Sequence, residues 1–255
     1  MKRAALNERA IFALAVQFLT RIPVPVGDAY TPARLAATPR HYPLVGALVG
    51  ALCAGIYSLT YAALSTEVAA LLAIATGLFV TGAFHEDGLA DTFDGLGGYA
   101  RERMLAIMRD SRIGTFGALA LVVMFGLKAA TLISLDTQYV ALILVVGHGL
   151  SRLSAVVAMA TSQYARDHGT GKPTADGIDA ASLTVALLTG AFLLAWVAFF
   201  ASPYAAFATL VGGLIGHIAM RLLYQPRLRG YTGDTLGAVQ QTTELGIYLG
   251  LLWWQ

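Results

Sequence analysis

The chain has 255 residues, of which 57% are hydrophobic and only 13% are charged, against about 25% charged residues in ordinary soluble domains. Its mean hydropathy of +0.66 favours an integral membrane protein, and a formal net charge of only +2 argues against nucleic acid as a partner. The single cysteine, Cys53, excludes a disulfide within the chain and lies in an apolar run, where we expect a packed thiol.

The first apolar run, residues 10–20, is too short to cross a bilayer, which takes about 17 to 25 residues. The N-terminus is only superficially like a signal peptide. Gln17 interrupts its apolar run, and no small-residue cleavage site precedes the proline-rich RIPVPVGD at 21–28. We therefore expect a retained amphipathic or re-entrant helix.

Later apolar runs are long enough to span a bilayer. Six of them are residues 43–65, 68–84, 114–135, 139–161, 180–201 and 204–224. A seventh run, 245–254, would span only if it extended back toward Glu244. The pattern predicts an all-α, polytopic membrane helix bundle with about six to seven transmembrane helices. We expect a single membrane-embedded domain over residues 1–255 in the lipid bilayer.

Basic residues occur in every second connection between these spans, so that they lie on one side of the predicted bundle. The connections near residue 66, at 136–138 and at 202–203 contain neither Lys nor Arg. The other connections and the N-terminus hold nearly all of them: Lys2, Arg3, Arg9, Arg21, Arg34, Arg40, Arg101, Arg103, Arg109, Arg112, Arg166, Lys172, Arg221, Arg227 and Arg229. The positive-inside rule predicts that these segments are cytoplasmic. Most acidic residues lie in the same segments, so this face is expected to carry the polar chemistry.

An acidic stretch, HEDGLADTFDG at 85–95, begins where an apolar run ends. It contains four carboxylates: Glu86, Asp87, Asp91 and Asp94. If the stretch is helical, the three aspartates lie within an arc of roughly 60° on one face. Like charges so placed repel, and a bound Mg²⁺, which takes carboxylates together with substrate phosphates, would offset the repulsion. The alternative is a solvated helix end; zinc is disfavoured because His85 stands alone.

The next polar segment, RERMLAIMRDSRIGTFG at 101–117, is rich in arginine. Arg109 and Arg112 lie on either side of Asp110, and guanidinium groups are suited to binding phosphate. The residues that follow place Ser111, Gly114 and Thr115 near the N-terminus of a span, where an anion is stabilised. The alternative is ordinary positive-inside arginine, mainly for Arg101 and Arg103.

A third polar segment, RGYTGDTLGAVQQTTELG, covers residues 229–246. It predicts a turn with Thr232 and Asp234, followed by a helix that carries Glu244. Asp234 could serve only as a helix cap, whereas an acid that enters an apolar segment, as Glu244 does, is functional by default. Lys128 and Arg152 fall inside predicted spans, where they either snorkel or face a polar cavity.

Small residues occur within several spans, in GALVG at 46–50 and at Gly212 and Gly216, where we expect close helix packing. The three polar segments together place an acidic metal site beside phosphate-binding arginines on one membrane face. Such an inventory indicates phosphoryl or phosphodiester transfer, in which positioning and charge neutralisation supply most of the catalysis.

With these residues in view, the chain resembles the cobalamin synthase family, the adenosylcobinamide-GDP ribazoletransferases. The matching segments are FLTRIPVP at 18–25, YPLVGALVG at 42–50, FHEDGLADTFDGLGG at 84–98, RERMLAIMRDSRIGTFGALAL at 101–121, LSR at 150–152 and GYTGDTLGAVQQTTELG at 230–246. The resemblance implies an Mg²⁺-dependent transferase of the cell inner membrane. It would join α-ribazole, or its 5′-phosphate, to adenosylcobinamide-GDP, with adenosylcobalamin, or its 5′-phosphate, and GMP as products.

The resemblance leads to a hypothesis for each polar residue. The Mg²⁺ ligands would be Asp87, Asp91, Asp94 and, with least support, Glu86. One of these aspartates, with Asp94 preferred, or Asp110 would take the proton of the attacking hydroxyl. Arg109 and Arg112 would stabilise charge on the phosphates. The substrate-binding set would be Lys128, Arg152, Thr232, Asp234 and Glu244. The sequence does not decide between a monomer and a homo-oligomer.

Two alternatives remain open at this point. CDP-alcohol phosphotransferases also place a metal-binding acidic helix at a membrane surface, with a motif of the form D-G-x-x-A-R. Here DGLA at 87–90 is followed by Asp91 rather than Arg. A secondary transporter would use Lys128, Arg152 and Glu244 as coupling charges, but the sequence shows no convincing internal repeat.

Overall fold

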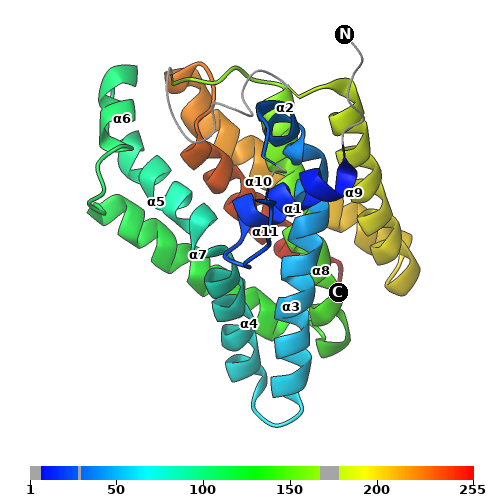
Figure 1. The fold of residues 1–255 in the computed structure, drawn as a ribbon. Coiled ribbons are helices and arrows are strands. Elements are labelled where there is room, and N and C mark those ends of the chain that lie inside the picture. The colour runs from blue at the N-terminus through cyan, green and yellow to red at the C-terminus, as the bar shows by residue number, and fades with distance from the viewer. Residues whose placement is uncertain (1–6, 28–29, 167–177) are drawn as a thin grey trace.

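A computed structural model describes residues 7–27, 30–166 and 178–255, and within these ranges the chain is a bundle of helices without strands (Figure 1). Lys2, Arg3 and Lys172, which contribute to the predicted charge pattern, lie outside the described residues. The helices in chain order are α1 (Glu8–Leu19), α2 (Pro32–Ala36), the 3₁₀ helix η2 (Thr38–His41), α3 (Tyr42–Tyr61), α4 (Thr66–Thr81), α5 (Phe84–Leu96), α6 (Arg101–Ile107), α7 (Thr115–Ser134), α8 (Thr137–Ala160), α9 (Ala180–Phe200), α10 (Pro203–Leu228) and α11 (Gly233–Trp254).

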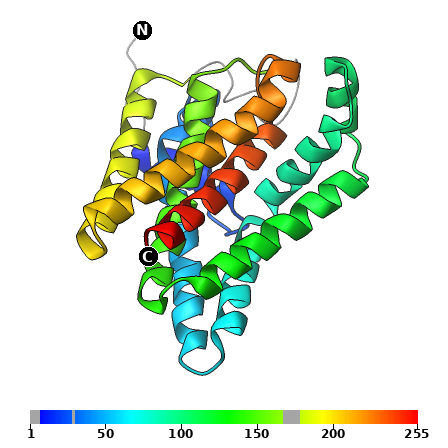
Figure 2. The ribbon, with the colours of Figure 1, turned by 180° about the vertical axis from the view of Figure 1, so that it is seen from behind.

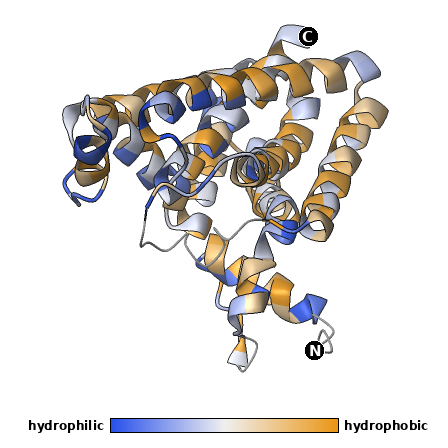
Figure 3. Ribbon diagram, turned by 90° about the horizontal axis from the view of Figure 1, so that it is seen from above, coloured by the Kyte–Doolittle hydropathy of each residue, from blue (hydrophilic) through white to orange (hydrophobic). Residues whose placement is uncertain are grey.

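Five helices in the described chain are long and apolar enough to cross a membrane by themselves: α3 with η2, α7, α8, α9 and α10. They confirm the predicted all-α polytopic bundle and five of its spans. The turns α3–α4, α7–α8 and α9–α10 lie in the lower half of Figure 1, and the polar connections lie above (Figure 1). Apolar residues dominate the long helices, and hydrophilic residues gather at the α6 end (Figure 3).

The predicted span 68–84 is not one straight helix. α4 ends at Thr81, and the next two residues, Gly82 and Ala83, have left-handed backbones with φ of 66° and 56°. This break bends α5 by 90° from α4, so the two helices count as a sixth crossing only as a bent pair. The bend turns the acidic stretch away from the direction of α4, and we treat α5 as lying outside the five spans.

The N-terminal helix α1 has 12 residues, too few to span a bilayer. Its first turn is capped by the side chain of Asn7, and it buries Ile11, Leu14 and Leu19 against the bundle. Glu8 forms an ion pair of 2.7 Å with Arg40 near the start of α3. The expected short helix is therefore present and packs on the bundle through one apolar face.

Glycines allow the long helices to pack with their backbones in contact, as expected from the sequence. A side chain at Gly46 would overlap the carbonyl of His148 on α8, and one at Gly212 would overlap the carbonyl of Gly246. A side chain at Gly216 would overlap the carbonyl of Thr242 on α11. α10 and α11 accordingly run side by side, drawn in orange and red in Figure 2.

We expect Gly216→Ala to destabilise the bundle by about 1–3 kcal/mol, because the added methyl group must push α10 and α11 apart. The matched control is Gly126→Ala on α7, where nothing lies within 4 Å of the added carbon and helix propensity favours alanine. Melting temperatures in detergent should fall for the first variant and stay level or rise for the second. Equal melting temperatures for both variants would contradict the close α10–α11 contact.

Candidate active site

Two glycines bring α5 and the start of α11 into direct contact. A carbon added at Gly88 would lie 2.7 Å from the carbonyl oxygen of Asp234, and one added at Gly237 would lie 2.8 Å from that of His85. Neither distance leaves room for a side chain, so both positions require glycine for this approach. The crossing places the acidic face of α5 beside the first turn of α11.

Three carboxylates meet at this crossing: Asp87, Asp91 and Asp234. Asp87 is exposed, and the other two are partly buried. Burial, together with the negative charges of Asp234 and Asp87, raises the pKa of Asp91 to about 7. Burial also raises the pKa of Asp234, although Arg166 opposes the shift. Burial is the main cause of both shifts, and a cation bound between these groups would favour their ionised forms. We call Asp87, Asp91 and Asp234 the acid cluster.

Arg166 lies beside the acid cluster, and sequence patterns assigned it only to the basic, cytoplasmic segments. Its Nη2 lies 2.6 Å from Oδ2 of Asp234. A short bridge between Tyr164 and Tyr231 holds its segment against the start of α11, with Ala165 N donating to Tyr231 O at 2.8 Å. Its Nε is buried and has no hydrogen-bond partner within the described residues, so this arginine keeps a donor for a ligand.

Asp94 does not join the acid cluster, although it shares the helix face of Asp87 and Asp91. Its carboxylate accepts hydrogen bonds from the backbone N–H groups of Gly114 at 2.7 Å and Gly117 at 2.8 Å. The anion site expected at the N-terminus of α7 therefore exists, but a side chain of the same protein fills it. This contact argues against the predicted metal-binding and proton-accepting roles of Asp94.

Asp110 and Arg112 pair with each other. Nη2 of Arg112 lies 2.6 Å from Oδ2 of Asp110, and hydrogen bonds from Arg112 lower the pKa of Asp110 to about 2. A carboxylate with so low a pKa is a weak base at neutral pH. Arg109 is exposed in the same loop after α6. The structure therefore does not bring the predicted loop residues to the acid cluster.

The charges inside the predicted spans neutralise one another. Lys128 on α7 donates hydrogen bonds of 2.7 Å to both Glu244 and Gln241 on α11. Glu244 also accepts hydrogen bonds from Gln240 at 2.6 Å and from Tyr248 at 3.2 Å. All five residues are buried. Lys128 and Glu244 thus form the centre of a buried polar core and line a small cavity within it, and their predicted role in substrate binding stays a prediction.

Glu86 and Arg152 extend this buried polar core. Glu86 accepts a hydrogen bond of 2.8 Å from Gln241, and its second carboxylate oxygen has no partner in the described residues. Arg152 donates to the carbonyl of His148 at 2.9 Å, and His148 lies 3.4 Å from Glu244. The cavity among these side chains has a volume of only about 20 Å³, which suits a water molecule and excludes a nucleotide. This burial argues against Glu86 as an Mg²⁺ ligand.

Thr232 is the N-cap of α11. Its hydroxyl accepts a hydrogen bond of 3.2 Å from Thr235 N, and the Thr235 hydroxyl accepts one of 2.8 Å from Thr232 N. Thr232 is fully buried, so it shapes the turn that presents Asp234 and has no free face for a substrate.

The described residues contain no group of three or more His, Cys, Asp or Glu side chains arranged to hold a metal ion by themselves. Asp87 and Asp91 are separated by one helical turn, and Asp234 approaches them from a second helix. Such a set suits Mg²⁺, which commonly takes one or two carboxylates and completes its shell with water and substrate phosphates. The raised pKa of Asp91 is the observation that fits a cation here.

The fold and the acid cluster together define a class of protein: a multi-pass helical membrane protein with a negatively charged site where α5 crosses α11. Comparison with known families goes further. The family model described as cobalamin-5-phosphate synthase matches residues 11–252, and the chain belongs to this family.

Curated relatives match over nearly their whole length. An adenosylcobinamide-GDP ribazoletransferase of Leptothrix cholodnii is 45% identical over 98% of this chain and 97% of its own. Proteins of the same name from Shewanella frigidimarina and Vibrio cholerae are each 39% identical, over 97% and 95% of this chain and 95% and 93% of their own. The family resemblance seen in the sequence is thereby confirmed. No solved structure matches.

Proposed function

We propose that this protein joins α-ribazole, or α-ribazole 5′-phosphate, to adenosylcobinamide-GDP and releases GMP. The product is adenosylcobalamin or its 5′-phosphate, which completes the nucleotide loop. Relatives of that name, matched from end to end, support the reaction class, and the acid cluster supports the place where it occurs. The cluster is the single structural observation that carries the proposal, because it is a concentrated negative site suited to a cation–diphosphate complex.

The reaction exchanges one phosphorus–oxygen bond for another. A ribose hydroxyl oxygen of the ribazole attacks the phosphorus attached to the cobinamide arm. The bond from that phosphorus to the bridging oxygen of the diphosphate breaks, and GMP leaves with this oxygen. The hydroxyl proton passes to a carboxylate, for which Asp87 and Asp91 are the candidates because Asp94 and Asp110 are already occupied.

The Mg²⁺ ion would be held by Asp87, Asp91 and Asp234, and when bound it would neutralise charge on the diphosphate. Arg166 holds Asp234 in place through its 2.6 Å ion pair, and its Nε–H, which has no partner among the described residues, is a candidate donor to a phosphate. The close contact at Gly88 and Gly237 fixes the spacing of these groups. We place the site at the cytoplasmic face of the inner membrane, where the basic connections predict it.

The test is incubation of the purified protein in detergent with adenosylcobinamide-GDP, α-ribazole 5′-phosphate and Mg²⁺. We expect GMP and adenosylcobalamin 5′-phosphate in equal amounts. GMP without the joined product would indicate hydrolysis, and no GMP at all would overturn the proposal. A parallel reaction with a CDP-alcohol donor should release no CMP.

The Mg²⁺ requirement should depend on pH because Asp91 must lose its proton to bind the ion. Its pKa is raised to about 7, so it is mostly ionised above that pH and mostly protonated below it. The Mg²⁺ concentration for half-maximal GMP release should therefore rise steeply as pH falls below 7, approaching about tenfold per pH unit. In Asp91→Asn, any residual activity should lose this dependence. A Mg²⁺ requirement that stays constant from pH 8 to pH 6 would contradict a ligand role for Asp91.

A further inference from the structure

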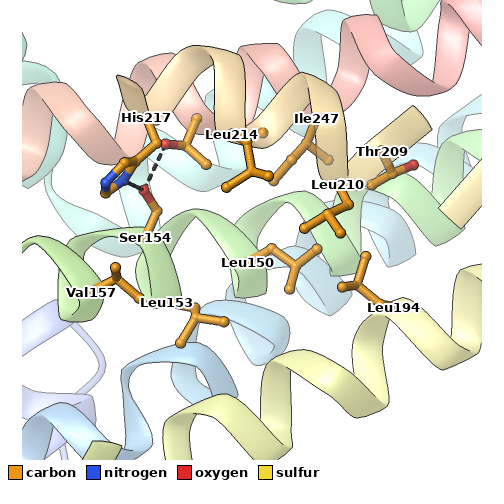
Figure 4. A pocket seen from close by; sticks show the side chains of 12 residues that line it. Leu150, Leu153, Ser154, Val157, Leu194, Thr209, Leu210, Leu214, His217 and Ile247 are labelled. Carbon is orange, nitrogen blue, oxygen red and sulfur yellow. Dashed lines mark hydrogen bonds between the residues drawn. The ribbon is translucent and has the colours of Figure 1, made fainter. Parts of the chain in front are cut away.

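A cavity of about 150 Å³ lies among α8, α9, α10 and α11, apart from the acid cluster (Figure 4). Its walls are almost entirely apolar and include Leu150, Leu153, Leu194 and Leu214. Thr209 lies at one end of the cavity, and at the other end Ser154 lies between His217 and Thr243 (Figure 4). A volume of this size can hold an apolar group comparable to benzene.

The Ser154–His217 pair has the wrong proton arrangement for a catalytic dyad. Ser154 Oγ lies 2.7 Å from Nδ1 of His217, and Nη1 of Arg221 lies 3.2 Å from Nε2 of the same ring. A guanidinium can only donate, so Nε2 is the acceptor and Nδ1 carries the proton. Nδ1 then donates to Ser154 and cannot remove its proton. The polar end of the cavity therefore recognises a ligand or stabilises packing, and it does not supply a nucleophile.

Arg221 continues this polar end toward the basic side of the membrane. It donates to three neutral oxygens: Thr161 at 2.8 Å, Ser162 at 2.9 Å and Gln225 at 2.9 Å. No carboxylate of the described residues forms an ion pair with it. Arginine remains charged at every relevant pH, so this site carries an uncompensated positive charge. Within the part of the chain that the structure describes, one N–H of Nη2 and the hydroxyl hydrogen of Ser162 are left to donate to an anion.

The cavity and Arg221 belong to one continuous surface. His217 lines both the cavity and an open groove of about 460 Å³ that also includes Arg221 and Gln225. Leu214 lines the cavity and Ile218 lines the groove, and these side chains of α10 are 49% and 51% exposed on the apolar outer surface of the bundle. An amphiphile could therefore enter from the lipid without crossing the protein.

We propose that this surface binds an anionic glycerophospholipid, with one acyl chain in the apolar cavity and the phosphate on Arg221 and Ser162. The charge favours a phosphate, and the long apolar lining favours an acyl chain over the polar nucleotide substrates. Arg221 lies in the last two turns of α10, on the basic side where phospholipid headgroups of the inner leaflet are found. The lipid would fix α10 against α8 at the end where the Arg166 segment begins.

The experiment is native mass spectrometry of the full chain in detergent, titrated with dioleoylphosphatidylglycerol. Wild type should retain one lipid. Arg221→Gln should weaken retention by roughly tenfold, because a charge-assisted phosphate contact is lost. Leu214→Trp should weaken it as well by filling the cavity while leaving Arg221 intact, which keeps the test valid if the first variant does not fold. Arg103→Gln, an exposed arginine on α6, is the matched control and should bind like wild type.

Two further ligands test the contributions of the phosphate headgroup and of the acyl chains separately. Dioleoylglycerol, which lacks the phosphate, should bind weakly to wild type, and glycerol 3-phosphate, which lacks the chains, should not displace the lipid. Equal retention by wild type, Arg221→Gln and Leu214→Trp would overturn the proposal. So would equal binding of dioleoylglycerol and phosphatidylglycerol, or loss of binding in Arg103→Gln.

Discussion

Asp91→Asn should lower the rate of GMP release by roughly 10²- to 10³-fold without unfolding the protein. Asp91 is the member of the acid cluster that feels the negative charges of both Asp87 on the same helix and Asp234 on α11. Asparagine has the same shape but no charge, so the variant tests the charge alone. The rate should be measured by GMP release at saturating Mg²⁺, with the melting temperature in detergent as the readout of folding.

The melting temperature of Asp91→Asn should stay level or rise at neutral pH. The folded-state pKa of Asp91, about 7, lies above its ordinary value of 3.8, so the folded protein favours the protonated form. Ionisation therefore destabilises the folded state, an effect that begins above pH 3.8 and is complete above pH 7. Asparagine removes that penalty, so the free energy of unfolding should rise while activity falls. This trade-off between stability and activity is common at functional sites.

Asp94→Asn is the matched control on the same helix face. It weakens the contact of Asp94 with the N-terminus of α7, so it should cost about 1 kcal/mol of stability. Its rate of GMP release should stay within about tenfold of wild type if the protein remains folded. Full activity in Asp91→Asn together with loss of activity in a folded Asp94→Asn would reverse the assignment of the two residues.

Lys128→Met should be among the most destabilising single substitutions in the bundle, at about 3–5 kcal/mol. The change leaves Glu244 buried among α7, α8 and α11 without the cation that lies 2.7 Å away. A loss of this size corresponds to a fall of roughly 10 °C or more in the melting temperature. Thermal unfolding in detergent measures it directly.

The double variant Lys128→Met/Glu244→Gln should recover most of that loss. Glutamine carries no charge; its carbonyl oxygen can still accept the hydrogen bond from Gln240, and its amide N–H can donate to the hydroxyl oxygen of Tyr248. The comparison separates the cost of an unpaired charge from the loss of packing. If the double variant melts as low as the single variant, the charge of Glu244 is not the cause. If Lys128→Met melts like wild type, the buried polar core does not stabilise the fold.

The helices could be predicted from the sequence because apolar runs long enough to span a bilayer leave few other structures for the backbone. The bend at Gly82 and Ala83 could not, since both residues are ordinary in a membrane helix and only their left-handed backbones make the break. Gly216 was recognisable as a packing residue because a small residue within a span has few other uses.

The acid cluster was partly predictable. The spacing of Asp87 and Asp91 gives a shared helix face, and Asp234 stands out as an acid at a helix start. The same spacing also included Asp94, but spacing does not say which neighbouring helix each residue faces. Asp94 faces the start of α7, a contact across 20 residues of chain that includes a loop.

The partners of the buried charges were beyond the reach of sequence patterns. Lys128 and Glu244 are 116 positions apart, and each appears alone in its own apolar segment. A buried charge signals that some partner exists, whereas only the packing of α7 on α11 identifies it. Arg166 was missed for a related reason, because its ion pair with Asp234 depends on the short bridge between Tyr164 and Tyr231.

The most direct measurement of the central claim is Mn²⁺ binding by electron paramagnetic resonance, with Mn²⁺ in place of Mg²⁺ and adenosylcobinamide-GDP present. The acid cluster predicts that wild type and Asp94→Asn bind the ion, and that Asp91→Asn and Asp234→Asn bind it at least about tenfold more weakly. Equal Mn²⁺ affinity in all four proteins would contradict a metal site where α5 crosses α11.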